Sequence, residues 1–342
     1  MITEYWNRPA TIDRNNFKLK SLSSWSYNIA VGCEHACRFC YVPEVSTIRM
    51  GPKLAERGVK DPDAEWGDYV FLRDWHENKF QHSLRMAEAT KDLNLDGNRA
   101  VMLCTTTDPY QVLKQPYGAT RQNLVRWALK SILEKSTLNV RILTRSPLAQ
   151  EDFDLMKEFG PRLLFGMSLP TLNNTLAKIY EPKAPAPSQR LSTLRAARDA
   201  GLNIYVAVAP VYPDCDDQDM RATLNAIGLL DPVTVFMEPI NIRAGNVKRI
   251  EEHAKSLSVT VKTDVYSTPE AWREYAVRQL LMFESLAAEY GLRDRLHLWP
   301  DAALGSKDAR RQFADDTHNW SEKISYVGWL QYHWNKISAW PK

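Results

Sequence analysis

The stretch Gly32-Cys33-Glu34-His35-Ala36-Cys37-Arg38-Phe39-Cys40-Tyr41 decides the fold of this chain, because it gathers three of the five cysteines in the spacing C-x3-C-x2-C. An apolar run, residues 27–31, comes directly before it and is typical of a buried strand that ends at Gly32. Three thiols are therefore predicted on one loop, just past the carboxyl end of a strand.

Clustered thiolates of this kind bind zinc or iron–sulfur. A closed structural zinc site takes four ligands, and no C-x2-C or H-x3-H pair follows later in the sequence. An iron–sulfur cube held by only three cysteines would leave one iron open to a small molecule. The spacing favours such a cluster, with a structural metal knuckle and a chance grouping of thiols as the alternatives.

This motif, placed after a first strand, resembles the signature of the radical S-adenosylmethionine (radical SAM) superfamily. In that superfamily the open iron is chelated by the amino and carboxylate groups of the methionine moiety of SAM. The residue before the third cysteine, here Phe39, lies near the adenine. The resemblance therefore implies a 4Fe-4S cluster on Cys33, Cys37 and Cys40, with SAM as the second cofactor.

The composition is that of an ordinary globular protein, with 44% hydrophobic and 25% charged residues in a chain of 342. A net charge of +3 gives no strong electrostatic argument for nucleic-acid binding. The cysteine usage argues against a disulfide framework, and an oxygen-sensitive cluster needs a reducing compartment. No apolar leader or run of about 18 apolar residues is present, so we expect a cytoplasmic protein.

From residue 99 onward, short apolar runs alternate with amphipathic segments, which predicts strands and helices in turn. Strands are expected at residues 69–73, 100–104, 140–143, 163–167, 202–209, 233–236 and 296–299. Helices are expected at 75–92, from Thr120, at 151–159, from Ser188 to Gly201, at 218–229, and from Thr268 to Gly291. Residues 50–66 indicate an exposed excursion rich in turns.

Strands separated by helices of this size form βαβ units, and hence a parallel sheet with helices outside. Six such strands suit the partial (β/α)6 TIM-type barrel of radical SAM enzymes. A doubly wound open sheet is the alternative, but the first loop lacks a G-x-G-x-x-G motif. We expect an N-terminal extension at 1–24, with basic Lys18 and Lys20, a barrel core at 25–245, and a C-terminal helical, substrate-specific region at 246–342 packed on the core.

Reactive residues of parallel barrels lie at the carboxyl ends of the strands. Arg145 follows the third strand and could bind a carboxylate such as that of methionine. Thr106 and Ser168 could bind ribose hydroxyls, and Ala209 ends the fifth strand as a further cofactor-binding candidate. The alternatives are a solvated arginine and ordinary loop hydroxyls.

A narrower resemblance involves Tyr180-Glu181-Pro182, Arg190-Leu191 and Ala209-Pro210-Val211-Tyr212, which look like segments of the spore photoproduct lyase family. The stretch from Cys104 to Asp108 resembles that family's Cys-Thr-Ser-Asp, with one extra residue. The resemblance implies that Cys104 returns a hydrogen atom to a product radical and that Tyr41 takes part in the relay. Phe39 departs from the lyase, which has tyrosine there, and the chain from about residue 250 has no convincing match. A buried, purely structural Cys104 is the alternative.

The activity implied is reductive cleavage of SAM to a 5′-deoxyadenosyl radical, which takes a hydrogen atom from the substrate. An electron donor such as flavodoxin or ferredoxin would be a partner. Three interpretations of the substrate stay open: repair of a DNA lesion, modification of a small metabolite or natural product, and a non-catalytic iron–sulfur protein.

Overall fold

The computed structural model describes residues 1–15, 21–44, 50–91, 93, 95–243, 245–314, 320 and 325–342, so Lys18 and Lys20 lie outside the described residues. Its largest feature is an eight-stranded sheet in which β3 and β6 to β11 are parallel and β2 is antiparallel to β3. In spatial order the strands are β11 (Leu296–Leu298), β10 (Thr234–Pro239), β9 (Ile204–Val211), β8 (Leu163–Ser168), β7 (Asn139–Thr144), β6 (Ala100–Leu103), β3 (Trp25–Tyr27) and β2 (Ile12–Arg14).

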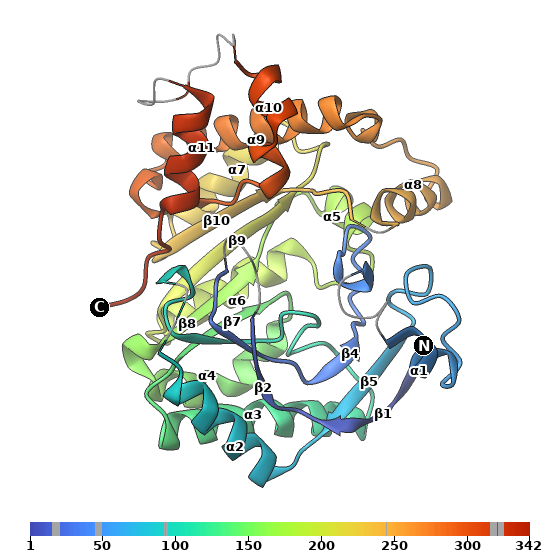
Figure 1. Ribbon diagram of the computed structural model, residues 1–342, viewed down its shortest axis with the longest axis vertical. Helices are drawn as coiled ribbons and strands as arrows, with labels where there is room; N and C mark the ends of the chain where they lie inside the picture. Colours follow the sequence, from blue (N-terminus) through green and yellow to red (C-terminus); the bar gives the residue numbers. More distant parts are fainter. Residues whose placement is uncertain are drawn as a thin grey trace.

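Helices cover the outer face of this sheet, and the predicted partial barrel of parallel strands with outer helices is confirmed (Figure 1). They are α2 (Glu77–Ala89), α3 (Tyr117–Lys135), α4 (Phe153–Glu158), α6 (Pro187–Asp199), α7 (Asp217–Gly228) and α9 (Pro269–Glu289). Their apolar residues join outward strand residues such as Val140 and Val206 in one large core. Among the described residues, no helix has the length and apolar character needed to cross a membrane.

The inner face of the sheet carries a second, smaller core, because successive strand residues point to opposite faces. It contains Leu164, Tyr205, Ala207 and Phe236. A Cβ at Gly166 would lie 2.2 Å from the Tyr205 ring, so the glycine of β8 leaves the space that this ring fills.

A separate three-stranded sheet leads into the cysteine loop, which is residues 33–40. Its order is β1 (Ile2–Pro9), β5 (Tyr69–Asp74) and β4 (Ala30–Gly32). The single strand expected at 27–31 is therefore wrong, because β3 belongs to the large sheet and β4 to the small one. The chain changes sheets at Asn28, whose Oδ1 accepts hydrogen bonds from the backbone and hydroxyl of Thr106.

Most predicted helices are present, with shifted ends. Helix α3 begins at Tyr117 after Pro116, so Thr120 lies within the first turn and is not the cap. The segment expected as one helix at 151–159 is a 3-10 turn, Pro147–Asp152, followed by α4. Helix α9 begins as predicted, because the Thr268 hydroxyl accepts a hydrogen bond of 3.1 Å from the Ala271 backbone.

Some elements were not expected from the sequence: β1, β2, α1 (Gly51–Ala55) and α5 (Asn174–Tyr180). Helices α8 (Asn246–Ser256), α10 (Lys307–Gln312) and α11 (Tyr326–Asn335) lie in the region 246–342 that was expected to be helical, although their bounds were not predicted. The excursion at 50–66 is only partly exposed, because Leu54, Val59 and Trp66 are buried against the small sheet. The many turn residues of this segment led to the prediction that it is exposed, whereas its few apolar side chains are buried.

The contact between Gly166 and Tyr205 can be tested by substitution. Gly166→Ala should lower the free energy of unfolding by about 1–3 kcal/mol, because the new methyl group overpacks the inner core. Gly328→Ala, on the exposed side of α11, is the matched control and should stabilise by up to about 1 kcal/mol through helix propensity. Urea denaturation measures both, and equal effects of the two substitutions would contradict this packing.

Candidate functional site

The cysteine loop directly follows β4 and has its thiols turned into the protein. Cys33 and Cys37 are buried and Cys40 is half-buried. Burial raises the pKa of all three thiols, that of Cys37 to about 12, and the neighbouring Cys37 and Cys40 raise the pKa of Cys33 further. A cationic group such as the core of an iron–sulfur cluster would stabilise the deprotonated form of the three thiols together.

No group of three or more His, Cys, Asp or Glu side chains in the described part of the chain converges on a point where one metal ion would fit. The cysteine ligands of a four-iron cluster each bind a different iron, so they lie around the cube and need not converge on one centre. Cys33, Cys37 and Cys40 therefore fit a cluster in their chemistry and burial, and they would be the residues that hold it.

Residues 105–107, three threonines that follow β6 and are called the threonine loop below, support the start of the cysteine loop. The Thr107 hydroxyl donates a hydrogen bond of 2.6 Å to the Gly32 carbonyl. Gln111 accepts from the Glu34 backbone at 2.8 Å and donates to the Thr107 hydroxyl at 2.8 Å. These contacts fix the backbone on both sides of Cys33.

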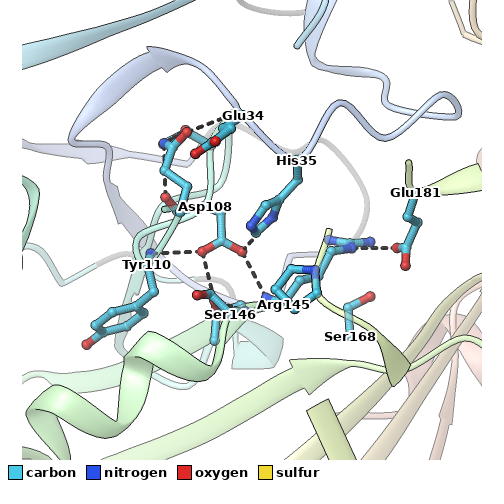
Figure 2. Close-up of polar contacts among 12 residues, drawn as sticks. Glu34, His35, Asp108, Tyr110, Arg145, Ser146, Ser168 and Glu181 are labelled. Carbon is cyan, nitrogen blue, oxygen red and sulfur yellow. Dashed lines mark hydrogen bonds and ion pairs between the residues drawn. The ribbon is translucent and has the colours of Figure 1, made fainter. Parts of the chain in front are cut away.

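Asp108 joins the cysteine loop to the end of β7 (Figure 2). Its carboxylate accepts hydrogen bonds from the Tyr110 backbone, the Thr144 hydroxyl and the Arg145 backbone, at 2.7 to 2.9 Å. The His35 Nδ1 lies 3.4 Å from the Asp108 Oδ2, and burial lowers the pKa of His35. His35 and Asp108 are therefore buried neighbours that connect the cysteine loop to the end of β7.

A buried ion-pair network lies beside this cluster of contacts, as Figure 2 shows for Arg145 and Glu181. Glu181 Oε1 accepts from Arg145 Nε at 2.6 Å, and its Oε2 pairs with Arg190 Nη2 at 2.5 Å. Burial would raise the pKa of Glu181, but Arg190 and Arg145 outweigh it and lower the pKa to about 2. Arg145 is thus not a solvated arginine, and its first carboxylate partner belongs to the chain itself.

The Phe39 ring is held between a cation and an aromatic stack. The Arg145 guanidinium lies 5.6 Å from the Phe39 ring centre, and the Tyr212 ring lies 5.8 Å from it. Tyr212 stacks on Tyr180 at 4.0 Å with nearly parallel planes. The segments that resemble the lyase family therefore meet in space at the cysteine loop.

The other predicted cofactor residues lie at strand ends, as expected, with their polar groups partly engaged. The Ser168 hydroxyl donates a hydrogen bond of 2.9 Å to the Ala209 carbonyl, which brings these two predicted residues together. The Thr106 hydroxyl donates to Asn28 at 3.0 Å. Binding of ribose hydroxyls by Thr106 and Ser168 stays a prediction.

Cys104 and Tyr41 both lie next to Thr105. Cys104 directly follows β6 with a left-handed φ of 61° and is buried in the main core, and its backbone N–H donates to the Tyr27 carbonyl at 2.8 Å. The Tyr41 hydroxyl donates to the carbonyl of the next residue, Thr105, at 3.3 Å, and the Tyr41 side chain is 40% exposed. No hydrogen bond between the Cys104 and Tyr41 side chains is found in the described structure.

Residues that sequence reasoning missed are the supports of the loop. Gln111 and Asn28 follow no recognisable motif, and Glu181 was noted only as part of a resemblance. Helix α8 contributes two further contacts to the loop, described below. The only signal that could have found Glu181 is a carboxylate flanked by a tyrosine and a proline after a short helix, which does not reveal its partners.

Comparison with known proteins now identifies the class. The sequence matches the family model of the radical SAM superfamily over residues 27–227, and the chain belongs to this superfamily. An uncharacterized protein of Acidianus two-tailed virus is 32% identical over 68% of this chain and 72% of that protein. An uncharacterized protein of Methanocaldococcus jannaschii is 24% identical over 72% of this chain and 81% of that protein.

Among solved structures, spore photoproduct lyase complexed with dinucleoside spore photoproduct is similar, with a TM-score of 0.58. The match covers 86% of this chain and 80% of that chain at 12% sequence identity, which shows a shared fold. The resemblance to the superfamily and to the fold of the lyase is confirmed. Membership of the superfamily implies a 4Fe-4S cluster and SAM as cofactors.

The Glu181 network gives a prediction for stability. Glu181→Gln should lower the free energy of unfolding by about 3–5 kcal/mol at pH 7, because two buried arginines lose their carboxylate. The pKa of Glu181 is depressed from 4.5 to about 2, so its contribution is fully present above the unfolded value and is lost as the pH falls toward 2.

The difference between wild type and Glu181→Gln in urea denaturation should therefore be smaller at pH 3 than at pH 7. Glu158→Gln, a glutamate in α4, is the control. A difference that is independent of pH would contradict the ion-pair assignment.

Proposed function

We propose that this protein is a radical SAM enzyme that cleaves SAM reductively at a cluster on Cys33, Cys37 and Cys40 and removes a hydrogen atom from a substrate. The observation that carries the proposal is the grouping of three thiols on one loop, two buried and one half-buried, with Arg145 of the neighbouring strand end packed against Phe39 of that loop. When bound, the reduced cluster supplies the electron that divides SAM into methionine and a 5′-deoxyadenosyl radical.

The chain's own residues have binding and orienting roles in this proposal. Phe39, whose ring lies between Arg145 and Tyr212, would offer an apolar face to the adenine. Ser168, Thr106 and the Ala209 backbone offer hydrogen bonds to the ribose and adenine. Arg145 is positioned by Glu181, and any remaining guanidinium donors would bind the methionine carboxylate.

The first candidate substrate is a lesion in DNA, which the shared fold with spore photoproduct lyase supports. The second is a small metabolite or natural product, which the small net charge of +3 favours. The proposal places the protein in the reducing cytoplasm, with a flavodoxin or ferredoxin as electron donor. DNA binding that weakens steeply with salt would support the first candidate, since phosphate contacts release counterions.

The cofactors can be tested directly. Anaerobically reconstituted protein should hold about one four-iron cluster on thiolates, and Cys33→Ala, Cys37→Ala or Cys40→Ala should each lose it. Reduced wild type with SAM should release 5′-deoxyadenosine, measured by chromatography, whereas Cys215→Ala should behave as wild type. Full iron content in any of the three cluster variants would contradict the proposal.

Cys104 separates repair-type chemistry from other reactions. If its thiol returns a hydrogen atom to the product radical, with Tyr41 in the relay, Cys104→Ala should still cleave SAM. The variant should then form misquenched products and consume more SAM per product, as measured by mass spectrometry. Tyr41→Phe should show the same change in SAM consumption, because it removes the O–H bond and keeps the ring.

If Cys104 is only a packing residue, its truncation should cost on the order of 1–2 kcal/mol of stability and leave the product unchanged. Unchanged products together with unchanged SAM consumption would rule out the donor role.

A further inference from the structure

Helix α8 lies outside the segment that matches the superfamily, yet it holds the cysteine loop. The Asn246 side chain donates to the Phe39 carbonyl at 3.2 Å. Arg249 donates from Nε to the Arg38 carbonyl at 3.2 Å and from Nη2 to the Cys40 carbonyl at 2.5 Å. Three consecutive carbonyls, from residue 38 to residue 40, are thus bound by two side chains of one helix.

Both donors are buried, with Asn246 at 0% and Arg249 at 5% exposure. A buried guanidinium is costly unless it is paired and hydrogen-bonded. Arg249 meets both conditions. Its Nε and Nη2 bind carbonyls of the loop, and its Nη1 forms an ion pair with Asp63, in the segment that follows the cysteine loop. The planar fork of arginine reaches carbonyls and carboxylate at once, which a lysine ammonium does not.

The space for this ion pair is built into the chain. A Cβ at Gly245, the residue before α8, would lie 2.3 Å from the Asp63 Oδ2. A positive and a negative charge therefore lie side by side at the Cys40 end of the loop. Arg249 is the nearer of the two to the loop, because it contacts the Cys40 carbonyl directly.

We propose that Asn246 and Arg249 are positioning residues that fix the turn from Cys37 to Cys40 for cluster binding, and that the Arg249–Asp63 pair sets the reduction potential of the cluster. This inference rests on the proposed function, since it needs a cluster on the three cysteines. Reduction adds one electron to the cluster, so a nearby cation stabilises the reduced state and a nearby anion disfavours it.

The charge effect is tested by redox titration of the reconstituted protein, monitored by electron paramagnetic resonance. Arg249→Gln should lower the reduction potential, and Asp63→Asn should raise it, because asparagine keeps the Oδ1 acceptor and loses only the charge. Lys248→Gln on the same helix is the control, with a side chain 77% exposed, and should leave the potential unchanged. If Arg249 and Asp63 only stabilised the fold, their two variants would not shift the reduction potential in opposite directions.

The positioning role is tested by iron loss to a chelator. Arg249→Lys keeps the charge and loses the fork, so its potential should stay close to that of wild type. Its cluster, and that of Asn246→Ala, should be lost about tenfold faster or more, as for other outer-shell contacts of metal sites. The thermal unfolding midpoint of each cluster-free variant checks its folding, and Asp63→Asn and Arg249→Lys decide the question if Arg249→Gln does not fold.

The outcomes separate this inference from the proposed function. Wild type that binds no cluster would overturn both. Wild type with a cluster, together with Arg249→Gln and Asp63→Asn potentials that are unchanged or move in the same direction, would overturn the charge role alone. Iron retention in Arg249→Lys and Asn246→Ala equal to that of Lys248→Gln would overturn the positioning role.

Discussion

The structure depends on keeping three thiols, two buried and one half-buried, together on a loop that has no regular secondary structure of its own. Burial disfavours the thiolate form of each cysteine, and the neighbouring cysteines further raise the pKa of Cys33 and Cys37. A loop of this kind cannot hold such a geometry through its own backbone hydrogen bonds. Its shape is imposed by polar groups from the surrounding elements, and the arrangement of the fold makes sense in these terms.

The supports come from every side and from distant parts of the sequence. The threonine loop after β6 binds the loop's start, through Thr107 and Gln111. Tyr180, at the end of α5, accepts from the Arg38 backbone at 2.8 Å, and α8 binds the end of the loop. The small sheet that carries β4 is formed with β1 and β5, so even the chain's first strand contributes to the position of the cysteines.

Sequence reasoning found what depends on local pattern and missed what depends on long-range pairing. The strands β6 to β10 and the helix α9 were predicted, because apolar runs and a threonine–proline start are local signals. The change of sheet at Asn28 could not be predicted, since it depends on a threonine loop almost eighty residues later. The bounds of helix α8 were not predicted, although region 246–342 was expected to be helical, because its sequence is largely polar and its apolar contacts come from Ile250 and Ala254, with Val247 partly buried.

The site divides in the same way. The cysteines and the strand-end residues were predicted from spacing and position, whereas the partner of Arg145 was not. An arginine after a strand is compatible with solvent, a ligand or an internal carboxylate, and only the fold shows that Glu181 comes from the end of α5 to meet it. Sequence reasoning expected Arg145 to bind the carboxylate of methionine. In the structure Glu181 already supplies a carboxylate to Arg145 and so orients its guanidinium.

The extra residue in the stretch from Cys104 to Asp108 has a structural explanation. Each of the three threonines is hydrogen-bonded to the segment from residue 28 to residue 32. Thr105 and Thr106 bind the Asn28 side chain, and Thr107 binds the Gly32 carbonyl. Asp108 then still reaches His35 and the end of β7. The longer loop therefore spans from the large sheet to the cysteine loop, so this departure from the lyase stretch acts on the support of the cluster loop.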